Sequence, residues 1–271
     1  MGTTLPRAEE RADLDARTRS DENVVYGLHA VQALITHQPL RIRELLIDDR
    51  RAAGNLAQWI LELGRQGFRY HLSSREVLDR LAQGGRHQGV VARVRAFSYC
   101  HLDELVVEDP PSAVLVLDGV EDPRNLGASA RAALTLGATG LVIPRDRAAQ
   151  VTPAAEHVAA GALVQLPVAQ VTNIVRALEE LKKLGLWIVG AEADASLRPW
   201  EVDLCGPVAI VVGGEDRGVR QLVRRACDHL VAIPMHAQGI MLNAADAACV
   251  LLYELARQRE MQQAPPPDSR G

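Results

Sequence analysis

The sequence of 271 residues is poor in cysteine, in lysine and in long apolar runs. Its four cysteines are far apart and form no C-x-x-C pair, which argues against a structural zinc site and against a disulfide framework. No apolar run reaches the roughly 18 residues needed to span a bilayer. The first 23 residues alternate acids and bases, unlike a signal peptide. We therefore expect a cytoplasmic protein without a metal and without a membrane partner.

Positive charge is carried almost entirely by arginine, because lysine occurs only at Lys182 and Lys183. Codon usage in a GC-rich genome would also produce this excess, so the placement of the charge is more informative than its type. Residues 24–98 hold 11 arginines and 6 acids, a balance of +5, although the whole chain has a net charge of −4. Since the planar guanidinium fork suits phosphate, this basic segment is a candidate phosphate-binding face.

The composition predicts five consecutive parts. The polar residues 1–23 and the proline-rich residues 261–271 predict disordered ends. Residues 24–98 alternate short helical and strand patterns, which predicts a small α/β domain. Residues 99–111 hold four acids, no base and a closing Asp-Pro-Pro, which predicts a linker. Residues 112–260 predict a second, larger α/β domain.

The apolar periodicity predicts the elements of each domain. In the first domain it predicts helices over 27–34, 55–66 and 73–81 and strands over 44–47, 68–72 and 90–94. In the second it predicts strands over 113–117, 141–143, 186–189, 208–212 and 229–233 and helices over 126–136, 171–184, 221–226 and 242–259. Such alternation predicts a mostly parallel sheet with helices on both faces.

Three turns rich in glycine and asparagine follow strands of this second domain. They read LDGVEDPRNLGASARAA from Leu117, VVGGEDRGV from Val211 and IPMHAQGIMLNAADAACVLLYE from Ile233. Because binding sites of α/β sheets form beyond the carboxyl ends of the strands, the turns predict one shared ligand site. The spacing G-G-x-x-x-G, late in the chain, argues against a Rossmann dinucleotide site.

The order and content of these turns resemble the three motifs of the SpoU (TrmH) family of SPOUT methyltransferases, which methylate a ribose 2′-hydroxyl of RNA with S-adenosylmethionine. YGLHAVQALI near the start and HQGVVARV from His87 extend the resemblance over residues 24–259. It is greatest to the RlmB-like branch, which acts on a guanosine of 23S ribosomal RNA. The resemblance implies a parallel sheet with a carboxyl-terminal deep trefoil knot, a ribosomal-protein-like RNA-binding module at the amino end, and a homodimer.

The resemblance also implies which residues hold the cofactor. The matching positions are Gly213, Ile233 and Leu242, with Gly190 as a weaker candidate. Backbone groups of the turns would bind the cofactor, while Ile233 and Leu242 would supply apolar walls. Glycine pairs after a buried strand also serve tight turns without any ligand, so Gly213 has a purely structural alternative.

Four further residues match catalytic positions of the family, namely Asn125, Arg131, Glu215 and Asn243. The resemblance implies that Arg131 reaches the acceptor ribose of the partner subunit's site, where a fixed guanidinium would stabilise the developing alkoxide. Since a guanidinium stays protonated, whether Arg131 also removes the proton is left open. The structural alternatives are a surface salt bridge for Arg131, helix caps for the two asparagines and a carboxylate near a helix start for Glu215.

The third turn departs from the family pattern at three positions. Ala237, Met241 and Ala245 replace a glycine and two serines, and a thioether cannot donate the hydrogen bond of a serine hydroxyl. This leaves two alternatives to an RlmB-like enzyme: a methyltransferase for transfer RNA or another ribosomal nucleotide, or a non-catalytic RNA-binding protein of ribosome assembly with the same fold.

Arg86, His87 and Gln88 match a segment near the end of the family's amino-terminal domain. A lone histidine is more often structural than functional, but the basic setting of this segment suits a loop that holds RNA.

Overall fold

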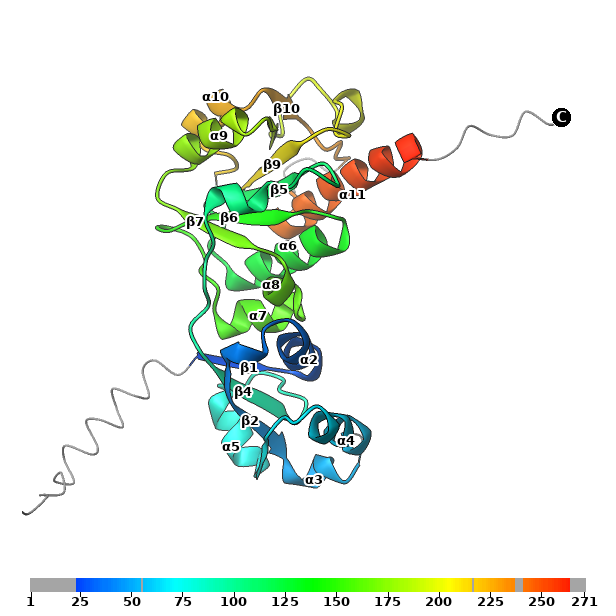
Figure 1. Cartoon of the computed structure of the whole chain (residues 1–271). Helices are drawn as coiled ribbons and strands as arrows, with labels where there is room; N and C mark the ends of the chain where they lie inside the picture. Colours follow the sequence, from blue (N-terminus) through cyan, green and yellow to red (C-terminus); the bar gives the residue numbers. More distant parts are fainter. Residues whose placement is uncertain (1–22, 55, 216, 237–240, 264–271) are drawn as a thin grey trace, which may run out of the picture. The chain divides into compact units, whose positions relative to one another are not determined.

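The computed structural model describes residues 23–54, 56–215, 217–236 and 241–263. The chain separates into two compact units, Met1–Ala96 and Phe97–Gly271, called unit 1 and unit 2 below (Figure 1). Most residues of the two ends predicted to be disordered lie outside the described residues. Asn23 and residues 261–263 are exceptions, because Asn23 begins the first strand and residues 261–263 continue the last helix.

Unit 1 is a four-stranded sheet with helices. Its elements are β1 (Asn23–Tyr26), α2 (Leu28–His37), η1 (Pro39–Arg41), β2 (Ile42–Asp48), α3 (Asp49–Ala52), α4 (Ala57–Arg65), β3 (His71–Ser73), α5 (Arg75–Leu81) and β4 (Val90–Val94). The strand order is β1-β4-β2-β3, in which only β2 and β3 pair in parallel. Leu78 and Ala82 pack against Tyr26, Leu46 and Val91, which holds α5 on the sheet.

Unit 2 is a six-stranded sheet whose described pairings are all parallel, as the alternation of strand and helix predicts. The strand order is β10-β8-β9-β5-β6-β7. Its elements are η2 (Leu102–Leu105), β5 (Ala113–Asp118), α6 (Pro123–Thr135), β6 (Gly140–Pro144), α7 (Pro153–Ala159), α8 (Ala162–Gln165), β7 (Val168–Val171), α9 (Ile174–Lys183), β8 (Trp187–Ala191), η3 (Pro199–Glu201), β9 (Val208–Gly213), α10 (Gln221–Ala226), β10 (His229–Val231) and α11 (Ala244–Gln263).

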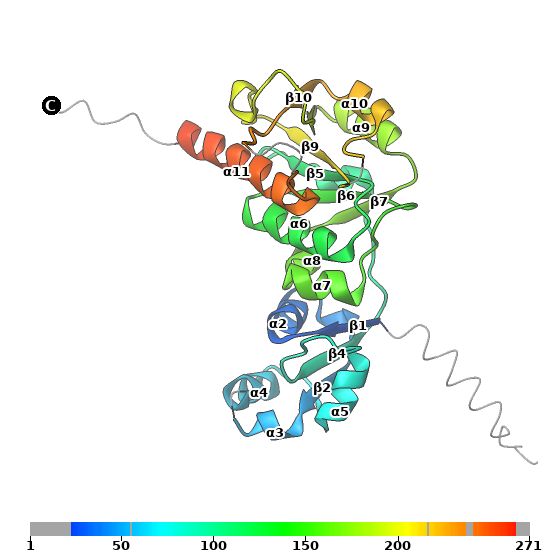
Figure 2. The ribbon, with the colours of Figure 1, turned by 180° about the vertical axis from the view of Figure 1, so that it is seen from behind.

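The central strand β5 is buried on both faces, and its side chains alternate between two cores. Leu115 and Leu117 enter the core formed with α6, α7, α8 and α11, whereas Val114 and Val116 enter the core formed with α9 and α10. Figures 1 and 2 show these two groups of helices on opposite sides of the sheet. This burial explains why β5 reads as a continuous apolar run rather than as an alternating one.

Three parts of unit 2 differ from the sequence prediction. The segment 99–111, predicted as a linker, packs on the unit 2 sheet, because Leu102 and Leu105 are buried there and Cys100 pairs with Ala169. The helix predicted over 171–184 begins only at Ile174, after β7. The helices α7 and α8 and the strand β7 were not predicted at all.

The last helix α11 packs on α6 and β9 and is fixed near its far end by two side chains. Gln258 accepts the backbone N–H of Leu204 and donates to the carbonyls of Pro199 and Val202. The half-buried guanidinium of Arg259 donates to four carbonyls, those of Pro111, Ser112, Leu204 and Gly206. These bonds tie α11 to the loop that precedes β9 and to the start of β5.

Candidate functional site

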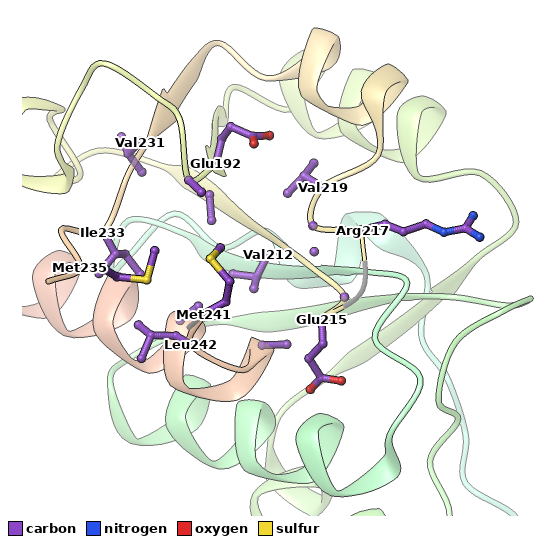
Figure 3. Close-up of a pocket in the computed structure, with 17 residues that line it drawn as sticks. Glu192, Val212, Glu215, Arg217, Val219, Val231, Ile233, Met235, Met241 and Leu242 are labelled. Atoms are coloured by element: carbon purple, nitrogen blue, oxygen red, sulfur yellow. The ribbon is translucent and has the colours of Figure 1, made fainter. Parts of the chain in front are cut away.

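A pocket of about 330 Å³ opens in unit 2 where strands β8, β9 and β10 end (Figure 3). This volume is at the lower end of the roughly 300–1,000 Å³ typical of small-molecule sites. Most lining residues are glycine, alanine or larger apolar residues. The lining set is Ala191, Glu192, Ala193, Val212, Gly213, Gly214, Glu215, Arg217, Gly218, Val219, Val231, Ile233, Met235, Met241, Leu242, Ala244 and Ala247.

The second turn forms one wall of the pocket, and it can close only because Gly213 and Gly214 have no Cβ. Gly218 donates its N–H to the carbonyl of Gly214 at 2.9 Å. A Cβ atom on Gly213 would collide with the backbone of Gly218 and Val219, and one on Gly214 with the carbonyl of Gly119. Gly213 therefore serves the tight turn and lines the pocket as well, so the two interpretations given for it do not exclude one another.

Asp118 fixes this turn to the central strand, and it was not among the residues predicted from the sequence. Its carboxylate has no exposed surface and accepts the backbone N–H of Arg220 at 2.9 Å and the Arg220 Nε–H at 2.7 Å. Its carbonyl also accepts the N–H of Gly214 at 3.0 Å. The available signal was an acid that ends a buried apolar strand, because buried carboxylates are rarely left unpaired.

Three of the four predicted cofactor-binding residues, Gly213, Ile233 and Leu242, line the pocket. Gly190 does not, although the next residue of β8 does. A Cβ on Gly190 would lie 2.8 Å from the Cys227 sulfur and 3.0 Å from Leu230, so this glycine allows close packing behind the pocket. Burial raises the pKa of the Cys227 thiol to about 12, which keeps the thiol protonated and unreactive.

Asn125, in the first turn, and Glu215, in the second turn, are joined by a hydrogen bond. The Asn125 amide donates to the Glu215 carboxylate, which lines the pocket. The predicted alternative for Asn125, a helix cap, is not what the structure has, because the N-cap of α6 is Asp122, whose side chain accepts the N–H of Arg124. In Figure 3 the Glu215 side chain points away from the labelled apolar residues.

Arg131 lies on α6, is exposed and does not line the pocket of its own chain. Within the described part of the chain, its guanidinium forms no hydrogen bond and no ion pair. The surface salt bridge that was its structural alternative is therefore not observed. The neighbouring Arg124, by contrast, is paired with Asp122 at 3.1 Å.

Asn243 is the N-cap of α11, which was its structural alternative. Its Oδ1 accepts the N–H of Asp246 at 2.8 Å, and its Nδ2 donates to the Asp246 carboxylate at 2.8 Å. Asn243 is not among the residues that line the pocket, whereas its neighbours Leu242 and Ala244 are. The single chain therefore brings together Asn125 and Glu215 beside the pocket, but not Arg131 or Asn243.

The three departures from the family pattern have different places. Met241 lines the pocket and lies among the labelled apolar side chains in Figure 3. Ala245 is buried in α11, and Ala237 lies outside the described residues. Met235 and Glu192 also line the pocket and were missed. Glu192 follows β8 and is ion-paired with Arg224 at 2.9 Å.

Among the described residues, no group of three or more histidine, cysteine or acidic side chains is arranged to hold a metal ion. No described helix has both the length and the apolar character needed to cross a membrane.

Both units match known protein families. Residues 112–253 match the SpoU rRNA Methylase family, and residues 24–100 match the family of RNA 2′-O ribose methyltransferase substrate binding domains.

Similar proteins cover nearly the whole chain. The 23S rRNA (guanosine-2′-O-)-methyltransferase RlmB of Shewanella oneidensis is 40% identical over 241 residues, which are 88% of this chain and 98% of that protein. The protein of the same name from Escherichia coli is 38% identical over 239 residues, 87% and 98% of the two chains. The crystal structure of the SpoU methyltransferase AviRb from Streptomyces viridochromogenes, in complex with the cofactor AdoMet, superposes with a TM-score of 0.75 at 29% identity and covers 94% of this chain and 95% of that chain. The chain therefore belongs to the SpoU rRNA methylase family.

Proposed function

We propose that this protein transfers a methyl group from S-adenosylmethionine to the ribose 2′-oxygen of a guanosine in 23S ribosomal RNA. The products are 2′-O-methylguanosine and S-adenosylhomocysteine, and the hydroxyl proton is released. The observation that carries the proposal is the pocket of unit 2, in which the ends of the strands and the second and third turns gather around one space. The names of the RlmB relatives support the substrate and the reaction.

The pocket fits S-adenosylmethionine by its size and by the chemistry of its walls. Gly213 and Gly214 leave backbone at the surface where any larger residue would fill the turn. Ile233 and Leu242 supply apolar contacts for an adenine ring, and Ala244 and Ala247 leave room beside them. When bound, the cofactor supplies a methyl group that its sulfonium already activates.

The protein's own task is to orient the ribose and to stabilise the charge that develops on its 2′-oxygen. We assign orientation to Glu215, whose carboxylate lies at the pocket and is held by Asn125. We assign charge stabilisation to Arg131, whose guanidinium has no partner within the described part of the chain. Asn243 acts indirectly: by capping α11 it holds Leu242 and Ala244 at the pocket wall.

We propose that two copies of the chain form the active enzyme, with Arg131 of each copy completing the other copy's site. The exposed face of α11 supports this arrangement, because Val250, Tyr253 and Met261 present apolar side chains at helical spacing. An apolar stripe of this kind favours contact with another protein surface. A cytoplasmic location and a trefoil knot involving the third turn belong to the same proposal.

Methyl transfer from radiolabelled S-adenosylmethionine to unmodified 23S ribosomal RNA tests the reaction. We expect label on the ribose of one guanosine, mapped by nuclease digestion and mass spectrometry, and no label when that residue lacks its 2′-hydroxyl. Label on transfer RNA alone would favour the transfer-RNA alternative, for which Met241 in the pocket is the motivating feature. RNA binding without cofactor binding or methyl transfer would favour the non-catalytic protein.

Mixing two inactive variants tests whether the subunits share their sites. Arg131→Ala and Glu215→Ala chains should each lose activity, whereas a mixed dimer has one site with both residues intact. We expect mixed dimers to recover about half of the wild-type activity, because one of their two sites is complete. Confirmed mixed dimers that stay inactive would contradict the shared site.

A further inference from the structure

Unit 1 contains a hollow of about 730 Å³ that the reaction described above does not use. It lies between α3, the start of α5 and the segment 84–89 that precedes β4. Four arginines line it, namely Arg50, Arg51, Arg75 and Arg86. The hollow therefore lies within the basic segment that the sequence analysis identified, and it gathers arginines that are up to 36 positions apart in the sequence.

The positive charge of this hollow is only partly compensated. The lining acids are Asp48, which is buried and accepts the backbone N–H of Arg50 at 3.0 Å, and Asp79, which lies 2.9 Å from His87 and 3.6 Å from Arg75. Within the described residues, the guanidinium groups of Arg50, Arg51 and Arg86 have no hydrogen-bond or ion-pair partner. All three arginines are exposed, so they can meet an anion from solvent.

The segment 84–89 that carries Arg86 is held in place from both sides. His87 is buried; its Nδ1 accepts the N–H of Gly89 at 3.0 Å, which leaves the ring proton on Nε2, where it is donated to Asp79. The side chain of Gln88 accepts the N–H of Leu28 at 2.9 Å. A site whose loop is already ordered loses less conformational entropy when it binds its ligand.

The lining residues indicate which part of an RNA the hollow fits. Proteins that hold single-stranded bases stack them on aromatic rings or on guanidinium planes, and the lining set of this hollow contains no phenylalanine, tyrosine or tryptophan. The imidazole of His87 is buried, and both of its nitrogens are engaged. Arginine guanidinium groups, by contrast, match phosphate oxygens in pairs.

We propose that this hollow binds consecutive phosphates of the substrate RNA through Arg50, Arg51 and Arg86, and that His87 is a positioning residue that holds the loop of Arg86. The contact is with the sugar-phosphate backbone, so it selects the shape of a folded RNA rather than its base sequence. The identification of the polyanion as RNA rests on the proposed function.

Two triple variants with the same change of charge test this site in the full-length protein. The first triple, Arg50→Ala, Arg51→Ala and Arg86→Ala, removes three of the four arginines that line the hollow. The second, Arg43→Ala, Arg65→Ala and Arg69→Ala, removes three exposed arginines of unit 1 outside its lining. The affinity for transcribed 23S ribosomal RNA is measured at several salt concentrations. Thermal unfolding and S-adenosylmethionine binding report that both variants are folded.

We expect the hollow variant to bind RNA about tenfold more weakly or worse, and the slope of log affinity against log salt to fall by about 2 to 3, since each phosphate contact contributes roughly 0.7 to 0.9. The control variant should keep a larger slope and a higher affinity. Equal losses in the two triples would overturn the proposal. If the hollow triple does not fold, the three single variants are measured instead, each with an expected loss of slope of about 0.7 to 0.9.

Two further measurements sharpen the test. Competition with inorganic phosphate distinguishes RNA from small phosphate ligands, and a separate methyl-transfer assay distinguishes this inference from the proposed function. Inorganic phosphate at the same concentration as the RNA should not displace it. A phosphate ion binds one arginine site independently, whereas the linked phosphates of an RNA bind several sites together. Displacement would overturn the assignment to RNA. Methyl transfer is assayed separately. RNA binding that depends on the hollow in a protein without transferase activity would uphold this inference and refute the proposed function, and an active enzyme with no such dependence would do the reverse.

Discussion

The two units bind through opposite kinds of surface. The pocket of unit 2 is built from backbone, small residues and apolar side chains, whereas the hollow of unit 1 is larger and is lined by four arginines. The first suits a small molecule that must be held in one orientation, and the second suits a long polyanion that must be held at several points. The two surfaces therefore leave different signals in the sequence: glycine spacing indicated the pocket of unit 2, and the uneven distribution of charge indicated the hollow of unit 1.

The largest expected effect is the loss of cofactor binding in Gly213→Ala. The new Cβ would collide with the backbone of Gly218 and Val219, so the second turn could not close. Calorimetric titration should detect no binding of S-adenosylmethionine, while RNA binding through unit 1 persists. Gly206→Ala is the matched control, because a Cβ there meets nothing within 4 Å. Unchanged cofactor affinity in Gly213→Ala would show that the pocket does not depend on this turn.

Arg131→Ala should lower kcat by about 10²- to 10³-fold, which is the usual cost of removing one donor that stabilises a developing oxyanion. The KM for RNA and the affinity for the cofactor should change little, because Arg131 lines neither surface. Arg124→Ala, at another exposed position of α6, is the control and should keep nearly full kcat. A similar kcat for both variants would remove Arg131 from the mechanism.

The salt concentration should affect RNA binding at the hollow of unit 1 much more than cofactor binding at the pocket of unit 2, and this can be measured on the unmutated protein. For three phosphate contacts, a rise from about 50 to 200 mM salt should weaken RNA binding by roughly 20- to 40-fold. Binding of S-adenosylmethionine to the mostly apolar pocket should change far less. Equal salt dependence of the two ligands, measured by titration in one buffer series, would erase the contrast between the units.

The smallest effect is expected for Asn243→Ala, which removes the cap of α11 and should cost about 1 kcal/mol of unfolding free energy. Denaturant titration measures the change, and Asn243→Asp should retain most of the stability because a carboxylate can still accept the N–H of Asp246. A hundredfold loss of kcat in a fully folded Asn243→Ala protein would instead indicate a direct part in the chemistry.

The sequence was sufficient for the local features of the fold. Apolar runs such as residues 113–117 and 208–212 placed the central strands, and the glycine pair at 213 and 214 identified the turn at the pocket. The pattern missed β7, α7 and α8, and it began the helix α9 at residue 171, which is the last residue of β7. In both places a short apolar segment fits helix and strand equally well, so only the packing decides.

The sequence did not predict the specific contacts between residues that are far apart in the chain. Asp118 and Arg220 are 102 positions apart, and Asn125 and Glu215 are 90 apart, so no local spacing relates either pair. Residues 99–111 were predicted to be a linker from their acids and prolines. Their two buried leucines, which hold the segment on unit 2, carry no distinguishing signal in a single sequence.

The hydrogen bonds that Gln258 and Arg259 make near the end of α11 have a consequence for folding during synthesis. Ribosomes make a chain from its amino end. The strands β8, β9 and β10, whose ends line the pocket, therefore emerge before the helix α11, which supplies Ala244 and Ala247. The anchors of that helix, Gln258 and Arg259, follow later still, 11 and 12 positions beyond Ala247. A nascent chain that stops short of them lacks the hydrogen bonds at the end of α11, so only the apolar packing of the helix holds the pocket wall that carries Ala244 and Ala247.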